Sequence, residues 1–155
     1  VVEGLRRQYT RLELVFVAHT VKAWEFPEAE FFQVRGSGGT VASSAFSLVK
    51  EIIDQRYDPS RYNIYLFYGS DGENFKDDHE AAEARLRELA VLSSFIGYVE
   101  TPVSEERALD SETGAIFKAV ADEGPAIGGY ALTTNESVWE AIRAFFREHV
   151  AAGTG

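Results

Sequence analysis

The chain lacks cysteine and methionine altogether. Without cysteine it cannot form a disulfide framework, a thiolate zinc site or a thiol nucleophile. Without methionine, even at its first residue, it does not begin at a native translation start, so we expect a fragment of a longer protein. A chain of 155 residues still buries a sizeable core without disulfides or structural zinc. We expect one partial domain over residues 1–155.

Basic side chains and long apolar runs are also scarce. Lys and Arg number 15 against 25 Asp and Glu, which gives a net charge of −10. Nucleic acids and anionic membrane surfaces are bound by clustered Lys and Arg, so the composition argues against both partners. No apolar run approaches the ~20 residues that cross a bilayer, and no signal-peptide pattern opens the chain.

Four short apolar runs predict strands. Residues 12–18 (LELVFVA), 63–68 (NIYLFY) and 95–100 (FIGYVE) are nearly continuous apolar segments, which is typical of strands covered on both faces. Residues 126–132 (AIGGYAL) predict a weaker strand, because two glycines reduce its packing.

Helical periodicity separates these runs. It predicts helices over residues 40–57, 77–92 and 105–122, and a last helix that begins near Ser137, with a capping box to Glu140. Strands that alternate with helices predict an α/β, Rossmann-like fold, with a mostly parallel sheet and helices on both faces. In such folds ligands bind beyond the carboxyl ends of the strands, which directs attention to the loops 19–39 and 69–76.

The first of these loops is rich in glycine. Gly38, Gly39 and Thr40 lead directly into the helix 40–57, whose first amides could receive an anion. Thr40 is expected at the N-cap, with a hydroxyl that either caps the helix or binds a ligand. A flexible loop with an ordinary threonine cap explains the same residues equally well. The segment is not a Walker loop, because the Gly-Lys-Ser/Thr ending is missing.

The second loop contains Ser70, Asp71 and Gly72, directly after the strand 63–68. Asp71 could bind a hard cation such as Mg²⁺, which favours one or two carboxylates and retained waters. An aspartate that bonds its own backbone in a turn is the commoner arrangement for Asp-Gly, and taken alone it is favoured.

Two other polar features are interpreted as structural. Residues 77–80 (DDHE) are consecutive on a predicted helix and point in different directions, so a solvated first turn is favoured over a metal site. His19 ends the strand 12–18 near the expected cleft but has no carboxylate close in sequence. A histidine satisfied within the fold is therefore favoured there.

Two loops at one sheet edge, one with Gly-Gly-Thr and one with Ser-Asp-Gly, resemble the metal-ion-dependent adhesion site of von Willebrand factor A domains. More closely, the chain is similar to the YeaH/YhbH family of bacterial stress and sporulation proteins, which carry such a domain at their C-terminal end. The similarity covers residues 5–146. Its most specific runs are VFVAHTVKAWEF, FIGYVET and EFFQVRGSGGTVASSAFSLVKEIIDQRYDPSRYNIYLFYGSDGENFKDD.

The resemblance carries several expectations. It implies a cytoplasmic protein without an established enzymatic activity, encoded beside a serine protein kinase and a SpoVR-like protein, either of which is a candidate partner. It also implies that Thr40 ligates Mg²⁺ or Mn²⁺, that Asp71 contacts the ion directly or through water, and that an acidic side chain of a partner completes the coordination.

One part of the family's site is missing here. No Asp-x-Ser-x-Ser motif occurs in the chain. The family pattern places the motif before Val1 in the sequence, after a first strand. In the sheet, that missing strand would lie between the strands 12–18 and 63–68. Either those two strands pair directly, or another segment or chain lies between them. With only Thr40 and Asp71 present we expect weak ion binding or none, and an exposed strand makes a homodimer conceivable.

The leading hypothesis is a non-enzymatic protein-interaction module of von Willebrand factor A type that docks a partner at the strand carboxyl ends. The alternative is a Mg²⁺-dependent phosphohydrolase or nucleotide-binding enzyme, with Gly38–Thr40 on phosphate and Asp71 with Glu73 on the ion. A third hypothesis is a scaffold whose loop motifs only shape turns. The expected docking loops include Gly38, Gly39, Ser70, Gly72 and His19.

Overall fold

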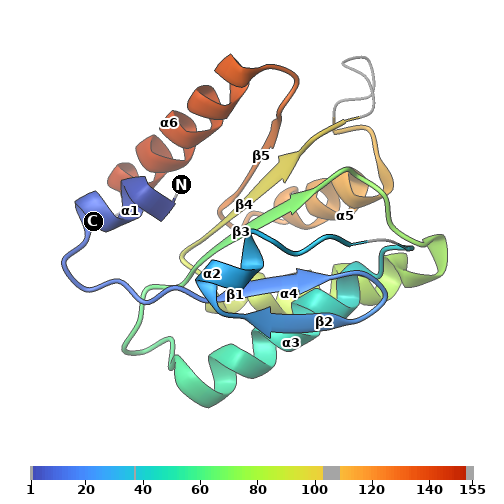
Figure 1. Cartoon of the computed structure of the whole chain (residues 1–155), viewed down its shortest axis with the longest axis horizontal. Helices are drawn as coiled ribbons and strands as arrows, with labels where there is room; N and C mark the ends of the chain where they lie inside the picture. Colours follow the sequence, from blue (N-terminus) through green and yellow to red (C-terminus); the bar gives the residue numbers. More distant parts are fainter. Residues whose placement is uncertain (1, 37, 103–108, 153–155) are drawn as a thin grey trace.

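The computed structural model describes residues 2–36, 38–102 and 109–152, which form two small sheets and the helices that cover them (Figure 1). Among these residues, no helix is long and apolar enough to cross a membrane. The elements in chain order are α1 (Val2–Gln8), β1 (Phe16–His19), β2 (Ala23–Phe26), α2 (Glu28–Phe31), α3 (Ala42–Arg56), β3 (Tyr65–Ser70), η1 (Lys76–Asp78), α4 (His79–Leu92), β4 (Phe95–Glu100), α5 (Glu112–Ala121), β5 (Ile127–Ala131) and α6 (Asn135–Ala152).

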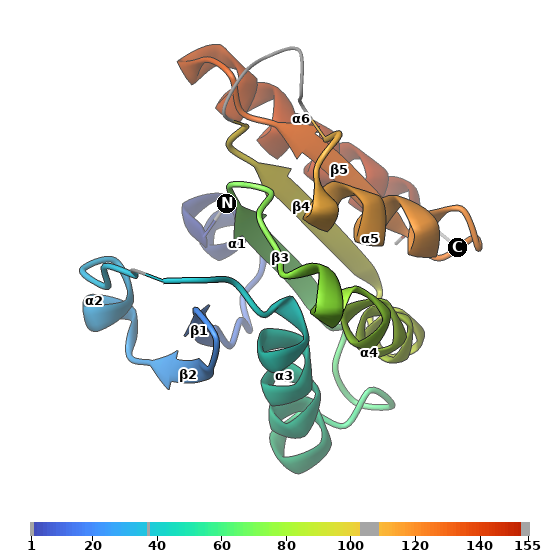
Figure 2. The ribbon, with the colours of Figure 1, turned by 90° about the vertical axis from the view of Figure 1, so that its right-hand side faces the viewer.

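The larger sheet is parallel, with the strand order β3-β4-β5. This confirms the α/β fold and three of the four predicted strands, one of them, 95–100, to the residue. Alternate residues of the central strand serve opposite faces: Ile96 and Tyr98 pack against α3, α4 and α5, while Phe95 packs against α6. Figure 2 shows α6 on one side of the sheet and α3 and α4 on the other.

Aromatic stacking fixes the core on the α5 side. The rings of Tyr98 and Phe117 are nearly parallel, with centroids 4.4 Å apart. Both residues are almost fully buried, so the helix α5 is held against the middle of β4 by large apolar surfaces.

The first predicted strand, 12–18, is wrong in extent and in pairing. Only β1 is a strand, and it pairs antiparallel with β2, a strand that we did not predict. Phe16 faces Phe26 in this ladder, so Val15 would fall opposite Pro27. Proline has no N–H to donate, and the hairpin therefore cannot extend toward Leu12.

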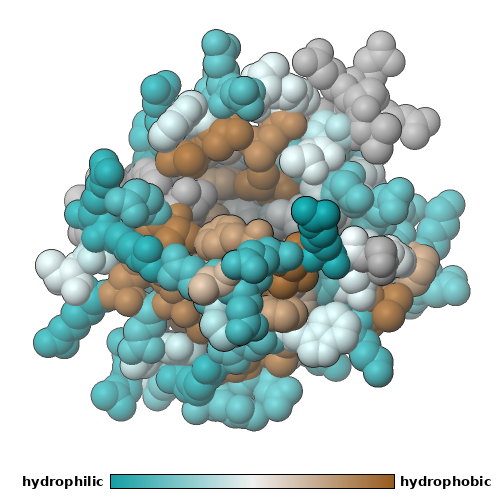
Figure 3. Space-filling model, in the orientation of Figure 1, coloured by the Kyte–Doolittle hydropathy of each residue, from teal (hydrophilic) through white to brown (hydrophobic). Residues whose placement is uncertain are grey.

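The hairpin and the parallel sheet do not join. β1 pairs only with β2 and β3 only with β4, so the alternative in which 12–18 pairs directly with 63–68 is wrong for the described residues. β1 packs on α3 instead, and the rings of His19 and Tyr68 stack between the two sheets at 5.4 Å. Figure 3, in the orientation of Figure 1, shows apolar side chains gathered across the middle of the molecule.

All four predicted helix starts differ from the structure, and α4 begins at His79 rather than at residue 77. Helix α3 begins at Ala42 rather than at residue 40, and α5 begins at Glu112; residues 105–108 of the predicted helix 105–122 lie outside the described residues. Helix α6 begins at Asn135. Its capping box is formed by Thr134 and Ser137, since Ser137 N–H donates to Thr134 Oγ1 at 3.2 Å and Thr134 N–H to Ser137 Oγ at 3.1 Å.

A glycine in the central strand makes room for α6. A Cβ added at Gly97 would lie 2.9 Å from the Phe67 ring and 3.0 Å from the Phe145 ring, whereas one added at Gly69 meets no atom within 4 Å.

We predict that Gly97→Ala destabilises the fold by about 1–3 kcal/mol through overpacking. Gly69→Ala, the matched control, should be neutral or slightly stabilising. Chemical unfolding of both variants measures the difference, and equal stabilities would contradict the proposed packing of α6.

Candidate functional site

The strands β1, β3 and β4 point to the same side of the molecule, and the loops that follow β1 and β3 lie together at one edge (Figure 1). We call this edge the carboxyl edge; it comprises residues 20–22, 36, 38–41 and 70–76. Main-chain hydrogen bonds join its segments: Val41 N–H donates to the Thr20 carbonyl at 2.9 Å, and Phe75 N–H donates to the Thr40 carbonyl at 3.0 Å. The two loops predicted to meet therefore do meet.

The first amides of α3 are capped by the neighbouring loop. Ala42 N–H donates to Asn74 Oδ1 at 2.9 Å, and Ser43 N–H donates to Asp78 Oδ2 at 3.0 Å. The Ser43 hydroxyl donates to the other oxygen of Asp78. Thr40 was expected at the N-cap, but Val41 occupies that position without a side-chain cap. The cap comes from residues more than thirty positions away because β3 delivers them there.

This capping corrects the interpretation of residues 77–80 as a solvated turn. Asp77 and Glu80 are exposed, but Asp78 is buried, and His79 is half-buried with its Nδ1 3.2 Å from Glu112. The turn η1 directs Asp78 toward α3, where the helix dipole and the two donors of Ser43 stabilise a carboxylate. Sequence reasoning missed Asp78 and Asn74 because their partners lie on another helix.

Asp71 shapes its own loop. Glu73 N–H donates to Asp71 Oδ1 at 3.0 Å, and Gly72 N–H donates to Ser70 Oγ at 3.0 Å. Gly72 has a φ of +94°, a conformation that glycine adopts without strain. The side chain of Asp71 is exposed, and within the described residues its second oxygen makes no hydrogen bond. The turn role and an outward-facing carboxylate thus coexist in one residue.

Phe75 is a further feature of the carboxyl edge that the sequence did not single out. A Cβ added at Gly39 would lie 1.9 Å from the Phe75 ring, so the ring rests directly on the glycine loop. About half of the side chain, 49%, stays exposed. Asp71 and Glu73 in the same loop and Asp77 in η1 are exposed and form no ion pair with any described residue.

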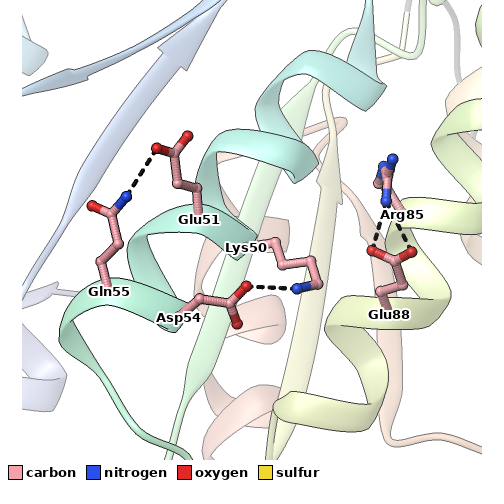
Figure 4. A network of polar contacts seen from close by, with 6 residues as sticks. All are labelled: Lys50, Glu51, Asp54, Gln55, Arg85 and Glu88. Atoms are coloured by element: carbon pink, nitrogen blue, oxygen red, sulfur yellow. Dashed lines mark hydrogen bonds and ion pairs between the residues drawn. The ribbon is translucent and has the colours of Figure 1, made fainter.

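Some charged residues on the helix faces are paired with neighbours on the same helix. Figure 4 shows Lys50 with Asp54 on α3 and Arg85 with Glu88 on α4, each pair within one helix. Such pairs at helical spacing are typical of a solvated surface and contribute a few tenths of a kcal/mol.

His19 lies beneath the carboxyl edge. Its ring stacks on Tyr68, and its Nδ1 lies 3.4 Å from the Thr20 carbonyl. Burial lowers the pKa of His19, partly offset by that carbonyl and by the charge of Asp78. Burial also raises the pKa of the Tyr68 hydroxyl, which makes no hydrogen bond among the described residues. The structural role of His19 is thus to join the hairpin to the parallel sheet.

The residues present do not fit a metal ion by themselves. No three His, Cys, Asp or Glu side chains of the described residues are placed to hold one. The expected ligands are the Thr40 hydroxyl and the Asp71 carboxylate, and one oxygen of Asp71 already accepts a hydrogen bond. Mg²⁺ requires near-octahedral coordination by six oxygens, so most of its ligands would have to be water or come from outside this set.

Comparison with known proteins places the chain among bacterial sequences. A family model described as "Protein of unknown function (DUF444)" matches residues 3–149. A UPF0229 protein of Bacillus thuringiensis is 35% identical over 144 residues, covering 93% of this chain and 36% of the relative. UPF0229 proteins of Halalkalibacterium halodurans and Thiobacillus denitrificans are each 34% identical over 148 residues, covering 96% and 95% of this chain. The chain spans 37% and 34% of these two relatives, just over a third of their length.

The incomplete ligand set generates a prediction for metal binding. Millimolar Mg²⁺ or Mn²⁺, compared with EDTA, should leave the thermal unfolding midpoint of this chain unchanged. An ion at 100 times its Kd would stabilise the fold by about 2.7 kcal/mol and raise the midpoint by several degrees. Such a rise, abolished by Asp71→Ala, would contradict the conclusion that these residues do not hold a metal ion by themselves.

The pKa of His19 generates a second prediction. Because this pKa lies below its ordinary value of 6.5, the unfolded chain takes up a proton at higher pH than the folded chain. Stability should therefore fall as the pH drops below 6.5 and level off below the folded pKa. Chemical unfolding between pH 7.5 and pH 5 tests this against His19→Phe, which keeps a ring on Tyr68. Identical pH profiles for the two proteins would show that His19 makes no such contribution.

Proposed function

The chain belongs to the DUF444 family of proteins of unknown function, and we propose that it is a non-enzymatic module that docks a protein partner at its carboxyl edge. The observation that carries the proposal is the bonding of the loop 70–76 to the first turn of α3 through Asn74 and Asp78. This bonding leaves the Asp71 carboxylate and the Phe75 ring facing outward from a rigid support.

Preorganised aromatic and charged groups are what docking requires. A rigid, half-exposed ring loses little entropy on binding and can fill a pocket of a partner, as interface anchors do. Unpaired carboxylates around it influence association rate and choice of partner. The carboxyl edge offers both within seven residues of the loop 70–76.

In its finer form, the proposal gives the whole protein a von Willebrand factor A-type domain. A strand between β1 and β3 and the Asp-x-Ser-x-Ser ligands would come from outside this chain, which spans just over a third of its relatives. Only with those ligands would Mg²⁺ or Mn²⁺ assist docking. The proposed partners are a serine protein kinase or a SpoVR-like protein in the cytoplasm, and a second copy of the chain is the competing occupant.

The alternative, a Mg²⁺-dependent phosphohydrolase or nucleotide-binding enzyme, has less support. The α3 amides that would cradle a phosphate already donate to Asn74 and Asp78. A phosphate there would also lie beside the buried Asp78 carboxylate, and two negative charges in one site repel. A partner that docks at the exposed Asp71 and Phe75 would neither displace these hydrogen bonds nor bring a second negative charge beside Asp78.

A pull-down of each proposed partner tests the docking role. In the whole protein, Asp71→Ala and Phe75→Ala should each weaken the complex by about tenfold, the usual effect of an interface anchor. The matched controls are Asp122→Ala, an exposed acid at the end of α5, and Val91→Ala, an exposed apolar residue on α4.

The controls should bind as the unchanged protein does, and all four variants should remain folded. If both proposed partners bind the Asp71 and Phe75 variants at full strength, the carboxyl edge is not the docking site. If neither partner binds the unchanged protein but the chain dimerises through the same residues, the occupant is a second copy.

A further inference from the structure

A buried carboxylate lies at the end of the central strand. Glu100, the last residue of β4, is only 1% exposed. It accepts hydrogen bonds from the Leu109 N–H at 2.9 Å, from the Ser111 hydroxyl at 2.6 Å and from the Tyr98 hydroxyl. A buried carboxylate costs free energy unless such donors surround it, so this arrangement requires an explanation beyond apolar packing.

One of these donors begins a helix. Ser111 is the N-cap of α5, and its hydroxyl oxygen accepts a hydrogen bond from Gly114 N–H at 2.9 Å while it donates to Glu100. Leu109, held by the same carboxylate, is the one described non-glycine residue with a positive φ, 62°. A bulky residue in this conformation is strained and persists only when its surroundings hold it there. Glu100 therefore fixes both Leu109, which leads into α5, and Ser111, the N-cap of α5.

The first turn of α5 in turn holds the loop that carries Asp71. Thr113 is fully buried; its N–H donates to the Gly72 carbonyl at 3.1 Å and its hydroxyl to the Glu73 carbonyl at 3.1 Å. A Cβ added at Gly72 would lie 2.7 Å from Ser111 and 3.2 Å from the Glu100 carboxyl carbon. The Asp71 loop is thus clamped between α3 on one side and α5 on the other.

We infer that Glu100 is a positioning residue for the carboxyl edge: it fixes the start of α5, and through Thr113 it sets the main chain on both sides of Asp71. Glu100 itself faces the interior and touches no partner. Its effect on docking rests on the proposed function, whereas the coupling between Glu100 and the Asp71 loop is a property of the chain alone.

Amide hydrogen exchange measures this coupling directly. In Glu100→Ala, exchange of the Gly72, Glu73 and Thr113 amides should accelerate at least tenfold relative to amides in the middle of α4. Glu100→Gln keeps the shape but replaces one carboxylate oxygen by an amide NH2. Either the Leu109 N–H or the Tyr98 and Ser111 hydroxyls, which share one oxygen, then lose their acceptor, so a smaller change of the same pattern is expected. Ser111→Ala, which removes the link to α5, should reproduce the pattern of Glu100→Ala.

The matched control is Ile96→Val, a buried residue on the same face of β4 that donates no hydrogen bond to Glu100 or to the Asp71 loop. It should lower overall stability without changing the ratio of loop exchange to α4 exchange. The inference fails if Glu100→Ala and Glu100→Gln accelerate all amides equally, or if the change stops at residues 109–114. Should the loop loosen while partner binding stays intact, the coupling stands and the docking proposal falls.

Discussion

The hydrogen bonds between Asp78 and the first turn of α3 are the contact on which the carboxyl edge depends. They connect the loop after β3 to the helix that precedes it in the chain, and they satisfy a main-chain donor that a buried helix start would otherwise leave unpaired. With Asn74 beside Asp78, the loop cannot move independently of α3. Thr40, Asp71 and Phe75 take their places from this connection.

The same arrangement recurs on the next strand. Asp78 follows β3 and Glu100 ends β4, and each is a buried acid whose oxygens accept hydrogen bonds from the residues that begin a helix. In both cases the acid joins a loop to a helix start, where the helix dipole favours negative charge. Neither acid is available to a ligand without loss of these bonds. Near the carboxyl edge, Asp71, Glu73 and Asp77 are exposed and remain available.

The hairpin is attached to the parallel sheet only indirectly. It contacts α3 and, through His19, the ring of Tyr68, but it shares no ladder with β3. Aromatic packing compensates on its outer side, where Phe16 lies 5.1 Å from the Phe31 ring of α2. The parallel sheet, by contrast, has a central strand buried on both faces. β4 should therefore be more rigid than β1 and β2.

Local pattern was sufficient for the regular elements of the parallel sheet. The strand 95–100 and the helix near 77–92 were predictable because apolar period and length reflect which faces are buried. The hairpin was not predictable in the same way. Its boundary depends on which residue stands opposite Pro27, and that register exists only once β1 and β2 have paired.

By itself, the sequence determined the alternation of strands and helices, the acidic charge and the meeting of the two loops, because these follow from periodicity, composition and parallel strand direction. Only the tertiary structure decided that Asp78 and Asn74, rather than Thr40, cap α3, and that Glu100 supports the Asp71 loop. Each of these contacts joins residues from different elements, and the free energy of a polar side chain depends on which donors the fold brings to it.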